Sequence, residues 1–441
     1  MMLSGWGRFP RVDAQVEQPR DAGALAALVQ ARPSLIARGN GRAYGDSAVN
    51  AAATIDMRRM NRMLAFDPAS GTLVAQAGVL LGDIISVFLP RGWFPLVTPG
   101  TRFVTLGGAI AADVHGKNHH GQGSFRSCVD WIEVMDADGA VRRCSRGEEP
   151  ALFDHTLGGM GLTGVIVRAA IRLRPVDSGW IRQTSIAAPN LAAAMAAFEA
   201  APEATYSVAW IDCLGRGAAL GRSLVMLGEH AGMHELPAGL AAQRFGPPPR
   251  RALAVPFDLP GVVLNRWAMR LFNSLYYRLG AARAGARLVD WERYFYPLDA
   301  IASWNRIYGR RGLVQFQCVL PLEQSAAGLA ALLAETSAAG AGSFLAVLKR
   351  FGPQDGAFAF PMPGYTLALD FPVTPRTLAL LDRLDAITLA HGGRFYLAKD
   401  GRMRADTLRA SDARVAGFQA FRAANGSNGR FRSAQSERLA L

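Results

Sequence analysis

Residues 97–125 (VTPGTRFVTLGGAIAADVHGKNHHGQGSF) bring titratable nitrogen atoms together with bare backbone. The stretch contains six glycines, three of the seven histidines of the chain and Lys117. An imidazole such as that of His115 titrates near neutral pH and can take a proton from a hydroxyl group, although it can equally be a hydrogen-bonded structural group. His119 and His120 are adjacent, so their side chains do not converge on one metal ion, and we predict no metal site.

Lysine is rare in this chain. It occurs only at Lys117, Lys349 and Lys399, so the other 45 of the 48 basic residues are arginine. A compact ammonium fits a tight contact that the wide guanidinium fork does not fill. The three lysines therefore mark candidate functional positions, with chance survival under a compositional preference for arginine as the alternative.

Two glycine-rich stretches are suited to a phosphorylated, flat ligand. In ARGNGRAYGDSAVN, residues 37–50, the glycines at 39, 41 and 45 allow successive amide groups to form an anion-binding concavity, although many such loops are only turns. In the second stretch, Gly107 and Gly108 remove side chains that would collide with a planar ring. GMGLTGV, residues 159–165, has the wrong glycine spacing for a dinucleotide-binding fingerprint.

Composition limits the class of protein. A chain of 441 residues, 50% hydrophobic and 19% charged, is typical of a globular protein of two or three domains. The formal net charge of +13 favours anionic partners such as a phosphorylated substrate or phospholipid headgroups. No zinc-finger or RNA-recognition pattern is present, so we predict no nucleic-acid partner. The four cysteines are far apart, which is typical of reduced thiols. The sequence shows neither the pattern of a secretory signal nor a membrane-spanning apolar run, so we predict a cytoplasmic protein.

The elements that must position these residues follow an α+β pattern. TLVAQAG, VDWIEVMDADGAV and GVIVRAAIRLRP are predicted strands, and DIISVFLPRG is a predicted helix that Pro90 and Gly92 terminate. From about residue 180, alanine-rich helices alternate with aliphatic strands. We therefore predict a first domain over 1–177 and a second over 178–393, the second with a mixed or antiparallel sheet that helices cover on one face.

A basic segment, residues 244–293, stands apart within the second domain. It holds nine arginines against three acids. On a helix, Val263, Trp267, Leu271 and Leu275 would share one face. A basic helix with aromatic residues is typical of a membrane interface, and the alternative is a helix that packs on its own domain with a solvated basic side.

Motifs in order along nearly the whole chain resemble the decaprenylphosphoryl-β-D-ribose 2-oxidase family of the vanillyl-alcohol oxidase superfamily. They include ARGNGRAYGDSAVN, TPGTRFVTLGGAIAADVHGKNHHGQGSF, LVQFQCVLP, FPMPGYTLALDFP and GGRFYLAKDGR, and they are weakest over 180–290. The resemblance implies FAD between a cofactor domain, which residues 394–441 complete, and a substrate domain. No histidine stands near Tyr44, where relatives with covalent flavin often have one, so we expect non-covalent FAD.

The resemblance also implies the residues of the site. The cofactor-binding set is Ala37, Arg38, Gly39, Asn40, Gly41, Arg42, Ala43, Tyr44, Gly45, Asp46, Ser47, Gly100, Thr105, Leu106, Gly107, Gly108, Ala112, Asp113, Val114, His115, Ile166 and Tyr396. The substrate-binding set is Lys117, Gln315, Gln317, Lys349, Tyr365, Ala368 and Lys399.

Lys399 and His115 are the predicted catalytic residues. Oxidation of a sugar alcohol leaves negative charge on the reduced flavin, which a fixed ammonium such as Lys399 would stabilise, and the hydroxyl proton must leave to a base such as His115. Gln315 and Gln317 alternate on a strand and so face one side, where amides suit sugar hydroxyls, although a plain polar sheet face is the alternative. Actinobacterial members carry cysteine in place of Ala368, so we expect turnover without capture by thiol-reactive nitroaromatic inhibitors.

The implied activity is FAD-dependent oxidation of the 2-hydroxyl of a polyprenyl-phosphate-linked ribose. A separate NADH-dependent reductase would then complete epimerisation to the arabino sugar, and the enzyme would lie against the inner face of the cell membrane. A soluble alditol, sugar or aldonolactone is the alternative substrate. A non-enzymatic basic protein that binds membrane or nucleic acid is a remote alternative.

Overall fold

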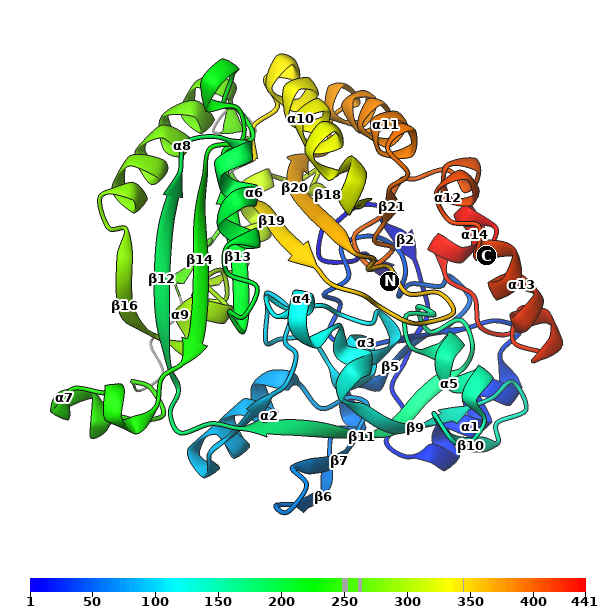
Figure 1. Cartoon of the computed structure of the whole chain (residues 1–441). Coiled ribbons are helices and arrows are strands. Elements are labelled where there is room, and N and C mark those ends of the chain that lie inside the picture. The colour runs from blue at the N-terminus through cyan, green and yellow to red at the C-terminus, as the bar shows by residue number, and fades with distance from the viewer. Residues whose placement is uncertain (248–252, 261–263, 344) are drawn as a thin grey trace.

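The computed structural model describes residues 1–247, 253–260, 264–343 and 345–441. It shows two sheet-centred domains side by side (Figure 1). A six-stranded sheet organises the first domain, and an eight-stranded sheet organises the second. The predicted two-domain α+β fold is confirmed.

Strand β11 is the central strand of the six-stranded sheet, where it pairs antiparallel with β7, β8 and β9. The strands predicted over residues 72–78, 129–141 and 164–175 correspond to β7, β9 and β11, and the second of these predicted segments includes the turn at 136–140 between β9 and β10. The strands of this sheet are β6 (Met63–Asp67), β7 (Thr72–Gln76), β8 (Trp93–Pro95), β9 (Val129–Met135), β10 (Val141–Ser145) and β11 (Val165–Pro175).

The two glycine-rich stretches follow regular elements of the first domain. Strand β4 (Ile36–Arg38) pairs parallel with β5 (Thr54–Asp56) and leads directly into the loop at residues 39–48. Helix α2 (Leu81–Phe88) ends as predicted before Pro90, and the chain then reaches residues 98–105. The other elements here are β1 (Met2–Leu3), β2 (Val12–Asp13), β3 (Val16–Glu17), α1 (Ala22–Ala31), α3 (Leu106–Ala111), α4 (His119–Gln122) and α5 (Pro150–Thr156).

The second domain is an antiparallel sheet. Its strands, in spatial order, are β16 (Gly285–Asp290), β12 (Trp180–Ala188), β14 (Ser223–His230), β13 (Tyr206–Ile211), β19 (Ala346–Phe351), β20 (Gly364–Pro372), β18 (Leu313–Pro321) and β21 (Arg394–Phe395).

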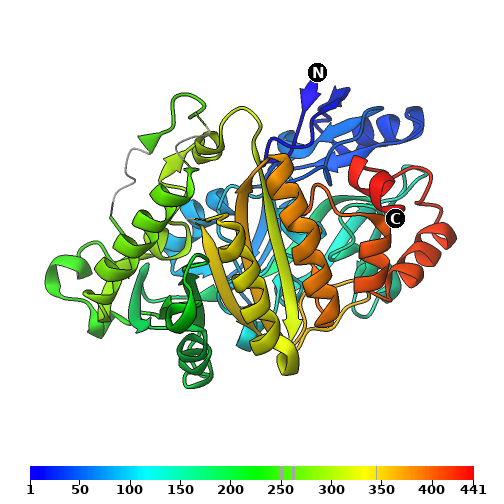
Figure 2. The ribbon, with the colours of Figure 1, turned by 90° about the horizontal axis from the view of Figure 1, so that it is seen from above.

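The alternation of residues along these strands decides which face carries the site. On β20, Leu367 and Leu369 pack in the core with Leu332 of helix α10 (Leu322–Ala339). Figure 2 shows α10 beside α11 (Pro375–Ala390) over β18 and β20, and α6 (Leu191–Glu199) covers β12 and β14. The residues between these leucines point to the opposite face, toward the first domain.

Part of the basic segment forms a long helix, α8 (Arg266–Ala281), which packs on β12 and β14. Residues 248–252 and 261–263, and with them Val263, lie outside the described residues. The neighbouring elements are α7 (Ala238–Ala241), β15 (Leu253–Ala254), α9 (Trp291–Phe295) and β17 (Ile301–Ala302). No helix among the described residues is both long enough and apolar enough to span a bilayer.

The end of the chain returns to the first domain. Arg438 Nη2 lies 2.7 Å from Asp46 Oδ1 in the first glycine loop, and Leu35 forms a parallel bridge with Phe431. These contacts place Phe431 and α14 (Ala434–Leu439) against the first domain, whereas β21 belongs to the eight-stranded sheet. Between β21 and α14 the chain forms α12 (Ala405–Ser411) and α13 (Val415–Ala424).

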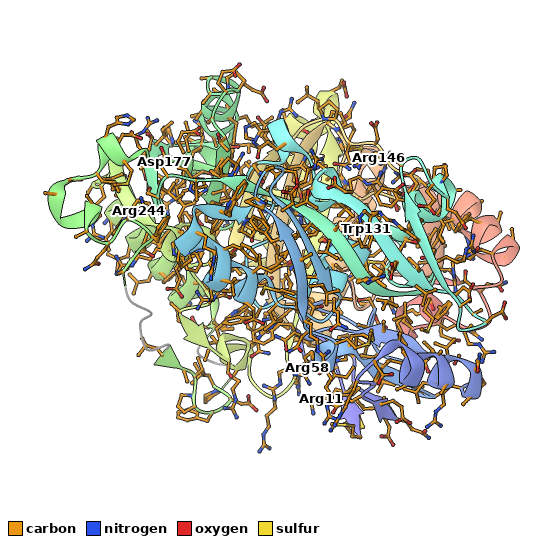
Figure 3. The ribbon with its side chains drawn as sticks, turned by 90° about the horizontal axis from the view of Figure 1, so that it is seen from below. Arg11, Arg58, Trp131, Arg146, Asp177 and Arg244 are labelled. Atoms are coloured by element: carbon orange, nitrogen blue, oxygen red, sulfur yellow. The ribbon has the colours of Figure 1, made fainter. Side chains whose placement is uncertain are left out.

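Exposed arginines are spread over the protein. In the view from below, Arg11, Arg58 and Arg146 lie on the first domain, and Arg244 lies on the second (Figure 3). Asp177 lies in the short connection between β11 and β12, where Gly179 donates a hydrogen bond from its amide to Arg244 O, at 2.7 Å. Exposed arginines therefore occur on both domains.

Candidate active site

A cavity of about 630 Å³ lies between the two glycine-rich stretches and the face of the eight-stranded sheet opposite α6, α10 and α11. Its walls come from residues 37–48 and 98–117, from strands β13, β18, β19 and β20, and from residues 396–399. All three lysines of the chain, Lys117, Lys349 and Lys399, line it. Residues far apart in the sequence thus converge on one cavity.

The two glycine-rich stretches meet at one wall of this cavity. A Cβ atom on Gly39 would lie 2.1 Å from Thr105 Oγ1, and Asn40 Nδ2 donates a hydrogen bond to Phe103 O at 2.9 Å. Thr105 also caps α3 by accepting from Gly108 N at 3.2 Å. Main chain therefore forms much of the lining, which includes Gly39, Gly41, Gly100, Gly107, Gly108, Gly116, Gly161 and Gly164.

Most of the predicted cofactor-binding residues line the cavity, and four do not. Gly45 and Asp46 contact the C-terminal segment, since a Cβ on Gly45 would lie 1.9 Å from Asp400 O and Asp46 pairs with Arg438. Leu106 is fully buried in the core of the first domain, and Asp113 is buried beside Arg126. The members that line the cavity are Ala37, Arg38, Gly39, Asn40, Gly41, Arg42, Ala43, Tyr44, Ser47, Gly100, Thr105, Gly107, Gly108, Ala112, Val114, His115, Ile166 and Tyr396.

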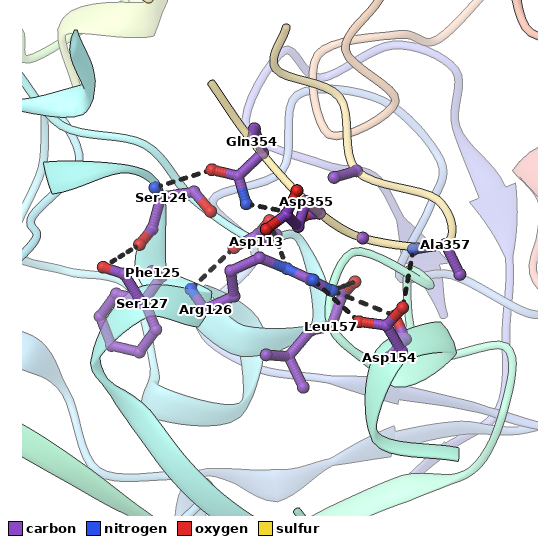
Figure 4. A network of polar contacts seen from close by, with 12 residues as sticks. Asp113, Ser124, Phe125, Arg126, Ser127, Asp154, Leu157, Gln354, Asp355 and Ala357 are labelled. Atoms are coloured by element: carbon purple, nitrogen blue, oxygen red, sulfur yellow. Dashed lines mark hydrogen bonds and ion pairs between the residues drawn. The ribbon is translucent and has the colours of Figure 1, made fainter. Parts of the chain in front are cut away.

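Asp113 belongs to a polar network behind the loop that carries His115 (Figure 4). Its Oδ1 accepts from Arg126 N at 2.9 Å, and Arg126 Nη1 donates to Asp154 Oδ1 at 2.8 Å. Asp154 Oδ2 in turn accepts from Ala357 N, at 3.1 Å, on the connection between β19 and β20. The network ties the His115 loop to the connection that packs beside it, so Asp113 has a positioning role here.

His115 is buried in the cavity wall, 7% exposed, among Phe351, Phe360 and Tyr396. Its Nε2 lies 3.0 Å from Gln317 Nε2, and its Nδ1 lies 3.5 Å from Lys349 Nζ. Burial, together with the charge of Lys349, lowers the pKa of His115 well below its usual value. The imidazole is therefore neutral, with a lone pair on one of its two ring nitrogens.

Lys399 stands against the first glycine-rich stretch, with its Nζ 3.8 Å from the centroid of the Tyr44 ring. Burial lowers the pKa of Lys399 to about 8, and the Asp370 carboxylate opposes that shift. Asp370 is fully buried, accepts a hydrogen bond from Gln315 Nε2, and leaves its Oδ2 without a hydrogen-bond partner among the described residues. Burial raises the pKa of Asp370 to about 7, and the charges of Asp370 and Lys399 each favour the charged form of the other.

Lys117 and Lys349 are two further cations on the same cavity. Lys117 Nζ donates to Tyr294 O and lies 4.1 Å from the centroid of the Tyr294 ring. Burial lowers the pKa of each lysine to about 7, and the charge of Lys349 adds to the shift of Lys117. Because no carboxylate pairs with either ammonium among the described residues, a bound anion would stabilise their protonated forms.

The sheet face supplies the polar side chains that the substrate prediction named, with one exception. Gln315, Gln317 and Ala368 line the cavity. Tyr365 does not, because it stands an odd number of residues from Ala368 on β20 and points to the helix-covered face, where its hydroxyl donates to Glu199 Oε1 at 2.7 Å.

Several residues of the cavity were not predicted. Trp210 on β13 and Tyr276 on α8 form a wall, with ring centroids 4.8 Å apart. Trp6 covers Arg42, whose guanidinium carbon lies 4.1 Å from the ring centroid. Asp370 had a detectable signal, namely an acid within the apolar run YTLALDFPV, whereas the aromatic wall depends on tertiary packing.

The residues present fit FAD. The glycine-lined wall of the cavity suits a long phosphorylated ligand. The buried Arg42 Nε has no hydrogen-bond partner among the described residues, so a phosphate or ribose oxygen would satisfy this donor. Residues 37–48 and 98–108 would hold the cofactor, which when bound supplies a hydride acceptor. Lys399 would hold positive charge, His115 would take a proton, and the aromatic wall would exclude water.

Comparisons with known proteins agree with this site. Residues 14–145 match the FAD binding domain family. The chain is 34% identical to the decaprenylphosphoryl-β-D-ribose oxidase of Mycolicibacterium smegmatis over 451 residues, which covers 100% of this chain and 97% of that protein. The L-gulonolactone oxidase of Bos taurus is 27% identical over 36% of this chain and 36% of its own length. The cytokinin dehydrogenase 5 of Arabidopsis thaliana is 35% identical over 24% of this chain and 20% of its own length.

The match to the mycobacterial enzyme runs through both domains, and the family match covers both glycine-rich stretches of the cavity. The chain is therefore an FAD-dependent oxidoreductase, and it belongs to the decaprenylphosphoryl-β-D-ribose oxidase family.

Proposed function

We propose that the protein oxidises the 2-hydroxyl of a ribose linked through phosphate to a polyprenyl lipid. The observation that carries this proposal is the convergence of all three lysines on one cavity beside the glycine-rich loops. A phosphodiester is an anion that Lys117 and Lys349 would bind. The sugar hydroxyls match the amides of Gln315 and Gln317.

The oxidation removes two electrons and two protons from the sugar. FAD held by the glycine-rich loops would supply the acceptor for the C2 hydrogen and its electron pair, and His115, whose neutral imidazole carries a lone pair on one ring nitrogen, would take the hydroxyl proton. The product is a 2-keto sugar. A separate NADH-dependent reductase would then deliver a hydride to that carbonyl and complete epimerisation to the arabino sugar.

The proposal includes non-covalent FAD. His115 is the one histidine on the cavity wall among the described residues, and its ring nitrogens face Gln317 and Lys349. All four cysteines are buried, and none lines the cavity. Release of intact FAD on acid or heat denaturation tests this point, and flavin that stays with the unfolded chain would refute it.

The proposal also places the enzyme peripherally on the inner face of the cell membrane, where a lipid-linked substrate is reached. The activity is tested by incubating the holoprotein with farnesylphosphoryl ribose and trapping the product with borodeuteride. We expect deuterium at C2 of the sugar, in both the ribo and the arabino epimers. Deuterium at another carbon, or unaltered substrate with full FAD occupancy, would refute the proposed reaction.

A further inference from the structure

Helix α8 turns its apolar side outward. Trp267, Leu271, Leu275 and Leu279 recur every four residues and are 63%, 72%, 54% and 49% exposed, respectively. The residues of α8 that are buried include Asn273, a polar side chain. A helix on the surface of a water-soluble domain normally shows the opposite arrangement.

The buried side of α8 is anchored, so this orientation is built into the fold. Asn273 Nδ2 donates to Asp212 Oδ1 at 2.7 Å, and Arg222 Nη2 donates to Ser274 Oγ at 3.1 Å. A Cβ on Gly280 would lie 2.1 Å from Leu224 Cδ1, so the helix lies close against β14. Rotation that buried the leucines would break the Asn273 bond and this close contact.

The helix flanks the candidate active site. Leu224 and Met226 point to the same face of β14, since they are two residues apart. Leu224 contacts α8, whereas Met226 lines the cavity together with Tyr276 of α8. Figure 1 shows α8 at the outer edge of the second domain, next to β12 and β16. The exposed apolar stripe therefore lies on the helix whose Tyr276 lines the cavity.

The charges around the stripe indicate what covers it. Helix α8 carries Arg266, Arg270 and Arg278 and no acidic residue. The guanidinium carbons of Arg266 and Arg270 lie 4.6 and 5.7 Å from the centroid of the Trp267 ring. A tryptophan and leucines bordered by arginines match an interface of acyl chains and anionic headgroups.

We propose that the exposed face of α8, consisting of Trp267, Leu271, Leu275 and Leu279, docks on an anionic lipid bilayer. This inference deepens the proposed function, because it identifies the surface that would bring the cavity to a lipid-linked substrate. A second copy of the chain fits this face less well, since two α8 helices in contact would bring six arginines together without an acid from either helix.

Flotation with vesicles tests the proposal. The holoprotein is mixed with vesicles of phosphatidylcholine alone, or of equal parts phosphatidylcholine and phosphatidylglycerol. We expect binding to the anionic vesicles, and a loss of about tenfold or more in partitioning for the double variant Leu271→Gln/Leu275→Gln. Arg270→Gln/Arg278→Gln should weaken binding to anionic vesicles by a similar factor.

Matched controls lie on other faces. Leu64, on β6, is 45% exposed, and Arg409, on α12, is also exposed. Leu64→Gln and Arg409→Gln should bind vesicles as the parent protein does. Equal binding by the α8 variants and the parent would overturn the proposal, as would self-association of the parent that the leucine variants abolish.

The same variants separate docking from activity. Leu271 and Leu275 do not line the cavity, so turnover of dissolved farnesylphosphoryl ribose should be unchanged in the double variant. Turnover of a long-chain substrate embedded in vesicles should fall with the loss of binding. Parent protein that oxidises the dissolved substrate without binding anionic vesicles would overturn docking alone. Vesicle binding without oxidation of either substrate would refute the proposed function and leave docking supported.

Discussion

Lys399 Nζ lies 3.8 Å from the centroid of the Tyr44 ring, and this contact joins the segment near the carboxyl end to the first glycine-rich stretch. It places a buried ammonium on the cavity wall where the first glycine-rich stretch meets the eight-stranded sheet. In an apolar site, such a charge stabilises developing negative charge far more than it would in water.

Replacement of Lys399 should therefore slow the reduction of the flavin. For Lys399→Ala we expect a rate of flavin reduction lower by about 100-fold, with FAD still bound. Lys399→Arg should restore little of it, because the planar guanidinium is wider than the ammonium that lies 3.8 Å from the Tyr44 ring centroid. Anaerobic stopped-flow absorbance measures this rate. Normal reduction in Lys399→Ala with full FAD occupancy would remove Lys399 from the catalytic residues.

Asp370 should set the pH dependence of Lys399. The carboxylate raises the pKa of Lys399 against the effect of burial, so Asp370→Asn should lower that pKa below about 8. Because the rate falls as Lys399 loses its proton, the alkaline limb of the kcat profile should move to lower pH. Asp382→Asn, on an exposed site of α11, is the control. An unshifted limb in Asp370→Asn would contradict the coupling.

The affinity for a phosphorylated substrate should decrease as pH rises. Burial lowers the pKa values of Lys117 and Lys349 to about 7, so both lose their protons as the pH passes through that value. The KM for farnesylphosphoryl ribose should rise by about tenfold between about pH 7 and pH 9. In Lys349→Met the KM should be higher at pH 7 and should vary less with pH. A KM that is independent of pH in the parent would argue against lysine-bound phosphate.

The junction of the two glycine-rich stretches should be intolerant of even one methyl group. A Cβ on Gly39 would lie 2.1 Å from Thr105 Oγ1, whereas a Cβ on Gly417, in helix α13, has no neighbour within 4 Å. Gly39→Ala should purify with little FAD, and Gly417→Ala should retain it. The flavin-to-protein absorbance ratio reports the difference, and equal FAD content in the two variants would contradict this geometry.

Ala368 should determine the response to thiol-reactive nitroaromatic inhibitors. Ala368 lines the cavity, and the four native cysteines are buried away from it, with pKa values that burial raises to about 12. The parent protein should form no covalent adduct during turnover, and Ala368→Cys should form one. Intact-protein mass spectrometry distinguishes these results, and an adduct on the parent would contradict the prediction.

Much of the site could be predicted because it consists of local patterns. The loops at residues 37–48 and 98–108, the rare lysines and the Gln315–Gln317 alternation are all visible in the sequence, and the structure brings them to one cavity. Tyr365 was grouped with Ala368, although period-two alternation places residues three apart on opposite faces of a strand.

Other features depend on tertiary packing. Gly45, Asp46 and Asp113 belong to glycine-rich or polar motifs, but they contact the C-terminal segment and Arg126 instead of lining the cavity. The wall formed by Trp210 and Tyr276 exists because α8 packs on β12 and β14, which brings Tyr276 to Trp210 of β13, far away in the sequence. Hydrophobic periodicity along one element carries no information about such contacts.

The most direct test of the account is anaerobic reduction of the bound flavin by competing substrates. The holoprotein is mixed separately with farnesylphosphoryl ribose, free ribose, a soluble alditol and an aldonolactone at equal concentrations. We expect rapid loss of flavin absorbance with the lipid-phosphoryl sugar, and loss slower by about 100-fold or more with the others, because only the first carries a phosphate for the lysines to bind. Faster reduction by a free sugar, alditol or lactone would contradict it.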